Sequence, residues 1–182
     1  MLDNLQNLVR QNADEAVINN PAIPNEKNEM AISQAGNSIF ATLKNALNQG
    51  KIKEVLNYFK GGSAGNQEVV QEATTHYAQQ LQTNLGVDAR EAQSVASKVV
   101  PQTMTQLASK TADPNDSSFN IQDIFNQLSG GKTSRFNVQS LLNKYGGGKL
   151  DKDGDGDVDF QDLKAMFSGE GGVVDKVKGL FK

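Results

Sequence analysis

Apolar residues recur along most of the chain at the three- and four-residue spacing that places them on one face of an α-helix. The pattern is clearest between Asn25, which we expect to cap the helix start, and Gly50, which we expect to end the helix. The same spacing predicts further helices over residues 2–18, 52–60, 70–85 and 88–99. No segment of useful length alternates with a period of two, so the sequence predicts an all-α fold.

The last long helix and the loop after it divide the chain into two regions. Asp88 is placed to cap this helix, and Pro101 either kinks it or starts another helix at its first turn. "TADPNDSS" at 111–118 has the composition of a loop. We therefore expect a multi-helix bundle over residues 1–110 and a region of short helices over residues 111–182.

The C-terminal third repeats itself. Three segments follow one template of an apolar residue, Asn or Asp, an apolar residue, Gln, and then apolar positions closed by Ser or Gly: "FNIQDIFNQLSGGK" (119–132), "FNVQSLLNKYGGGK" (136–149) and "VDFQDLKAMFSGEGG" (158–172). Asn120, Asn137 and Asp159 are predicted N-caps, and the glycines permit a left-handed stop. Each unit is thus a very short helix, which must pack on its neighbours or on the larger helical body.

An acidic stretch in front of the third cap has the spacing of a twelve-residue calcium loop. In "KLDKDGDGDVDFQDL" (149–163) the first, third and fifth loop positions are aspartates, Gly156 is sixth and Val158 is eighth. Such a loop takes oxygen ligands from positions 1, 3, 5, 7, 9 and 12 and needs glycine at position 6 for a sharp turn. The predicted ligands are Asp151, Asp153, Asp155, Asp157 (through its carbonyl), Asp159 and Asp162.

A solvated acidic turn is the alternative, because Asp123 stands at the position of Asp162 in the first unit with no such loop before it. The register of the stretch favours a bound cation, because five independent positions match those of the calcium loop. Without an ion, the crowded carboxylates would repel one another. Six of the 21 acidic residues lie in this stretch of a chain whose net charge is only −3. The acidity is therefore local.

The stretch resembles the EF-hand calcium loop, and more closely its dockerin variant, in which position 12 is commonly aspartate. The resemblance covers about residues 151–167 and implies calcium coordination. "GGGKL" (146–150) stands where the EF-hand has the end of its entering helix, and one loop is present where EF-hands and dockerins usually have two. A single loop with the shorter Asp at position 12 predicts a structural or low-affinity site for Ca²⁺ or Mg²⁺ instead of a sensor.

A second resemblance covers residues 1 to about 131. The segments "NNPAIPNEKNEMAISQAGNSI" (19–39), "FKGGSAGN" (59–66), "SVASKVVPQTMTQLASKT" (94–111) and "DPNDSSFNIQDIFNQLSGG" (113–131) resemble the bacterial all-helical YidB-like family, which has no assigned activity. This resemblance implies a helical fold and a bacterial origin, and it transfers no catalytic residue.

Composition narrows the possible partners and compartments. The chain has no cysteine, which excludes disulfides and thiolate metal sites, and no basic cluster typical of nucleic-acid binding. The N-terminus lacks the pattern of a signal peptide, and no apolar run reaches the length of a membrane span, so we expect a cytoplasmic protein. The amphipathic tail at 173–182 could dock on a membrane surface or a partner groove, but packing on the protein's own core is favoured for so short a helix.

The sequence offers no nucleophile with a base and no acid–base pair; His76 is its one histidine. We therefore expect a non-enzymatic helical protein that binds one Ca²⁺ or Mg²⁺ ion mainly for stability, with binding or scaffolding of an unidentified protein partner as its wider role. Two alternatives remain: a dockerin-like module over residues 136–182 that binds another protein when calcium is present, and a helical enzyme that uses the metal.

Overall fold

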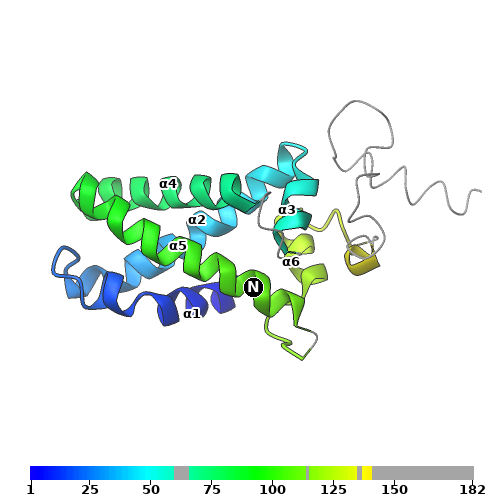
Figure 1. Cartoon of the computed structure of the whole chain (residues 1–182), viewed down its shortest axis with the longest axis horizontal. Coiled ribbons are helices and arrows are strands. Elements are labelled where there is room, and N and C mark those ends of the chain that lie inside the picture. The colour runs from blue at the N-terminus through cyan, green and yellow to red at the C-terminus, as the bar shows by residue number, and fades with distance from the viewer. Residues whose placement is uncertain (60–65, 114, 135–136, 141–182) are drawn as a thin grey trace, which may run out of the picture.

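The all-α prediction is confirmed for the part of the chain that the structure, a computed structural model, describes: residues 1–59, 66–113, 115–134 and 137–140 (Figure 1). These residues form helices joined by turns, and they form no strand. The elements are α1 Leu2–Asn12, the π-helix η1 Asp14–Ile18, the 3₁₀ turn η2 Asn25–Lys27, α2 Asn28–Asn48, α3 Ile52–Phe59, α4 Asn66–Leu85, α5 Ala89–Ala112 and α6 Ile121–Leu128.

Four long helices form an antiparallel bundle in which α1, α2, α4 and α5 each pack against two neighbours in that order around the ring (Figure 1). The short helices α3 and α6 lie together at one end of this bundle. Phe59 of α3 and Phe125 of α6 contact each other there, with ring centroids 6.1 Å apart. One continuous apolar core therefore includes residues of the long helices and of α6.

Helix ends follow local chemistry at most of the expected places. Gly50 and Gly86 have positive φ angles of 77° and 72°, which only glycine adopts without strain, and α2 and α4 end just before them. Asp88 caps α5 by accepting a hydrogen bond of 2.9 Å from the N–H of Arg90. The prediction that Asn25 caps the second helix is wrong. Asn25 lies in the 3₁₀ turn after Pro24, and its side chain makes no capping bond to α2.

Pro101 lies inside one continuous helix, α5, so the interpretation with two separate helices is wrong. The proline removes one backbone donor from the helix interior. Close to this point Tyr58 of α3, which is buried, donates its hydroxyl hydrogen to the carbonyl of Met104. Burial raises the pKa of Tyr58 far above its usual value, so the side chain remains a neutral donor that ties α3 to α5.

Candidate functional site

The six predicted cation ligands, Asp151, Asp153, Asp155, Asp157, Asp159 and Asp162, all lie outside the described residues, as does the tail at 173–182. Within the described residues no group of three or more acidic or histidine side chains is placed to hold a metal ion. His76 on α4 is half-buried, and its ring nitrogen lies 3.4 Å from the amide nitrogen of Gln80 one turn away. What the structure does describe is the connection that leads from the bundle toward the acidic loop.

The first repeat unit has the form that its sequence predicts. Asn120 caps α6, accepting hydrogen bonds from the N–H groups of Gln122 (2.8 Å) and Asp123 (3.3 Å). Gly130 and Gly131 end the unit with φ angles of 63° and 87°, and the Gly131 N–H returns to the carbonyl of Asn126 at 2.7 Å. The apolar positions are buried, and with eight residues α6 depends on this packing for its stability.

Gln122 connects the first unit to the second. Its Nε2 donates to the carbonyl oxygen of Thr133 at 3.1 Å, and its Oε1 accepts from the N–H of Val138 at 2.9 Å. Thr133, which is fully buried, also donates its hydroxyl to Asn126 Oδ1 at 2.8 Å. We call these four residues, Gln122, Asn126, Thr133 and Val138, the α6 joint. The joint fixes where the chain leaves α6 and where the next helix starts.

The start of the second unit is described over residues 137–140 and repeats the capping of the first. Asn137 Oδ1 accepts from the N–H of Ser140 at 2.8 Å, which confirms the predicted N-cap. Val138 is then the first helical residue, and only 1% of its surface is exposed. The N–H of a first helical residue has no partner within its own helix. Gln122 of the preceding unit supplies the acceptor for the Val138 N–H. Asn137 accepts from the N–H of Ser140, two residues further along.

The connecting role of the glutamine is not evident from local rules of helix formation. The sequence signal for this role is the repetition of Gln at the same template position, 122, 139 and 161. Helix propensity alone does not explain this repetition, because several other residues form helices equally well. Asp123, by contrast, occupies the position of Asp162 and is exposed. Its carboxylate makes no hydrogen bond within the described residues, so in the first unit an acid at this position is not required as a cap.

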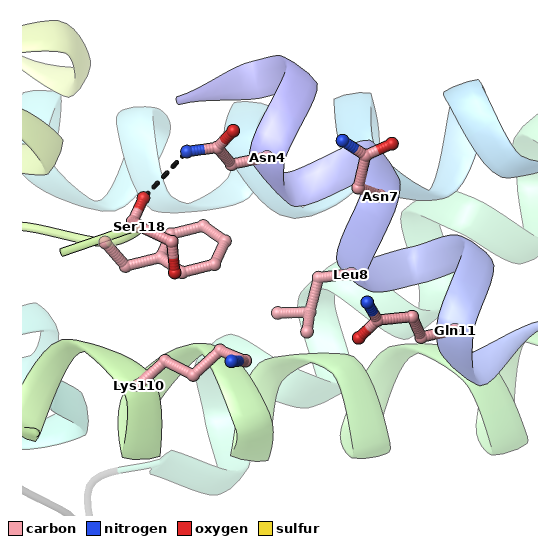
Figure 2. A pocket seen from close by; sticks show the side chains of 7 residues that line it. Asn4, Asn7, Leu8, Gln11, Lys110 and Ser118 are labelled. Carbon is pink, nitrogen blue, oxygen red and sulfur yellow. Dashed lines mark hydrogen bonds between the residues drawn. The ribbon is translucent and has the colours of Figure 1, made fainter. Parts of the chain in front are cut away.

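A shallow hollow of about 180 Å³ lies between α1, the end of α5 and the segment before α6 (Figure 2). Three amide side chains of one α1 face, Asn4, Asn7 and Gln11, line it together with apolar and hydroxyl groups. Asn4 Nδ2 donates to the carbonyl of Ser118 at 2.8 Å and so anchors the segment that leads into α6. The one ionisable residue in the lining is Lys110. Its lining therefore offers mainly amide and hydroxyl groups for hydrogen bonding.

Lys110 is held by Asp116, with Nζ 2.9 Å from Oδ2. The Ser118 hydroxyl and backbone N–H also donate to Asp116, which keeps this turn closed. These interactions lower the pKa of the Asp116 carboxyl to about 2; the Ser118 hydroxyl contributes most, followed by the Lys110 ammonium group. The pair orients the loop before α6 and is a structural feature of the hollow's edge.

Comparison with protein-family models, with curated proteins and with solved structures finds no match to this chain. In the described part of the chain, no helix has both the length and the apolar character that a membrane span requires. Inferences about function therefore rest on the residues of the chain itself.

Proposed function

We propose that this chain is a non-enzymatic helical protein of the bacterial cytoplasm that binds one Ca²⁺ or Mg²⁺ ion at residues 151–162. The ion would be held by the side chains of Asp151, Asp153, Asp155, Asp159 and Asp162 and by the carbonyl of Asp157. Its role is to stabilise the C-terminal repeat region. The wider role we propose is to bind or scaffold a protein partner.

One observation carries this proposal. Asp151, Asp153 and Gly156 have no counterparts ahead of the first two units, although the caps and stops of α6 form without them. Helix formation by the repeat thus accounts for an Asn or Asp at the predicted cap position, which is Asp159 in the third unit, but not for the acids before it. The behaviour of Asp123 supports the same conclusion, because an acid at this template position makes no capping contact that would explain Asp162 without a metal.

The test is calorimetric titration of Ca²⁺ and of Mg²⁺ into metal-stripped protein, with thermal melts in parallel. An ion present at 100 times its dissociation constant stabilises the folded state by about 2.7 kcal/mol. In a chain of this length that raises the melting temperature by roughly 5–10 °C if the region melts with the bundle. Asp155→Ala should abolish both the heat and the shift.

Asp123→Ala is the matched control, since it removes an exposed aspartate from the same repeat template outside the loop. It should bind the ion as the unchanged protein does. Absence of heat and of a melting shift with both ions in the unchanged protein would refute the site. Equal loss of binding in both variants would show that net charge, not the loop, attracts the ion.

A further inference from the structure

The hollow beside α1 is lined by a row of side-chain amides, two of which have no partner in the described part of the chain. Asn4, Asn7 and Gln11 follow one another at the three- and four-residue spacing of one helix face (Figure 2). The Nδ2 of Asn4 is occupied, because it donates to the carbonyl of Ser118. The side chains of Asn7 and Gln11 are exposed and make no hydrogen bond within the described residues. Each of these two amides can donate and accept hydrogen bonds.

The other lining residues disfavour a charged ligand and a stacked ring. Lys110 is the one cation among the described lining residues, and its Nζ lies 2.9 Å from Oδ2 of Asp116, which neutralises its charge locally. Phe119 is 4% exposed, so too little of its ring is accessible to stack on a ligand. The lining therefore favours a neutral ligand that both donates and accepts hydrogen bonds.

Two contacts of α1 show that amides on this helix already bind such groups. Asn4 binds a main-chain carbonyl, that of Ser118, in a segment that is not helical. Asn12 and Gln106 form a reciprocal pair, with Nδ2 of Asn12 3.1 Å from Oε1 of Gln106 and Nε2 of Gln106 2.9 Å from Oδ1 of Asn12. A main-chain peptide group presents the same donor and acceptor as these side chains. Amide recognition thus occurs on α1 both before and after the two unpartnered amides.

The spacing of the two unpartnered amides matches an extended peptide. Asn7 and Gln11 are four residues apart, which is about 6 Å along the helix axis. Carbonyls on one edge of an extended chain repeat every two residues, or about 6.7 Å. Each amide can therefore meet one of two successive main-chain groups on the same edge of a peptide that runs along α1.

We propose that the hollow between α1 and α5 is a docking site for an extended peptide segment of a protein partner, which Asn7 and Gln11 bind through its main-chain amides. This inference rests on the partner-binding part of the proposed function and is independent of the cation. The recognition is of the main chain, so the site selects an extended, neutral segment more than a particular side chain.

The experiment titrates N-acetyl-trialanine N-methylamide into the metal-stripped, full-length, ¹⁵N-labelled protein and follows the side-chain amide signals by NMR. The signals of Asn7 and Gln11 should shift and saturate. Loss of one net hydrogen bond predicts that Gln11→Ala weakens binding of this peptide about 3- to 10-fold. Gln71→Ala is the matched control and should leave binding unchanged. Gln71 is an exposed residue of α4, which is not a neighbour of α1 in the ring, and its side chain makes no hydrogen bond within the described residues.

Methyl glucoside and inorganic phosphate are titrated in parallel. Absence of saturable shifts at Asn7 and Gln11 up to the solubility limit of the peptide would refute the docking site. So would equal weakening by Gln11→Ala and Gln71→Ala, or saturation of these signals by the sugar or by phosphate but not by the peptide.

Repeating the titrations with Ca²⁺ and Mg²⁺ separates this inference from the cation site. If the protein binds the peptide but gives no heat with either ion, the cation site is refuted and the docking site stands. If it binds an ion and the peptide shifts neither amide, the docking site alone is refuted.

Discussion

Replacing Gln122 by alanine tests whether the α6 joint holds the repeat region to the bundle. The side chain makes hydrogen bonds of 3.1 Å to the Thr133 carbonyl and 2.9 Å from the Val138 N–H. Val138 is 1% exposed, so its N–H would be left buried or forced to open toward water. An unsatisfied buried donor costs about 1–3 kcal/mol, and the lost bond to Thr133 adds about 1 kcal/mol.

We therefore expect Gln122→Ala to lower the free energy of unfolding by about 2–4 kcal/mol, or the melting temperature by roughly 4–16 °C. The measurement is urea and thermal unfolding followed by circular dichroism, with hydrogen exchange at the Val138 amide as the local readout. Exchange at that amide should accelerate more than at amides within α2. The variant Gln122→Glu keeps the acceptor and loses only the Nε2 donor, which serves the Thr133 carbonyl and, at 3.4 Å, Asn126 Oδ1, so its effect should be smaller.

Gln127→Ala is the control for this prediction, because Gln127 also lies on α6 and its side chain is exposed. It makes the same change on the same short helix, so the difference in helix propensity between glutamine and alanine cancels in the comparison. Surface substitutions of this kind usually stay within about 0.5 kcal/mol. If Gln122→Ala is no more destabilising than Gln127→Ala and Val138 exchanges at the same rate in both, the joint does not contribute to stability.

Two further predictions concern the bundle and the loop before α6. Tyr58→Phe removes the hydroxyl that binds the Met104 carbonyl but keeps the ring, so it should cost about 1 kcal/mol in equilibrium unfolding; an unchanged stability would mean that the bond has no net value. Asp116→Asn removes a carboxyl whose pKa is lowered to about 2 by Ser118 and Lys110; because the lowered pKa stabilises the folded state above the unfolded pKa of about 3.9, the variant should melt below the unchanged protein at pH 7. That difference should shrink as the pH falls from about 4 through 2, and a constant difference across this range would contradict the assignment.

Local sequence determined most of the helices and their ends. Apolar spacing is a property of a single helix face, and most of the apolar positions that it marks along α2 to α5 are buried, with Phe40 and Val70 only partly so. Gly50, Gly86, Asp88 and Asn120 act through their own backbone conformation or through donors two or three residues away, so their roles can be read without the fold. The acidic register at 151–162 is likewise a statement of sequence, and it stays a prediction.

The tertiary structure decided what local rules left open. Pro101 is compatible with a kink or a new start, and packing of α5 along α1 and α4 keeps one helix. Asn25 has the right chemistry for a cap, yet the turn after Pro24 places the start of α2 beyond its reach. Gln122 is an ordinary helical residue until the chain turns back at Gly130 and brings Val138 to its side chain, because a contact across sixteen residues depends on the path of the chain and not on the residues at its ends.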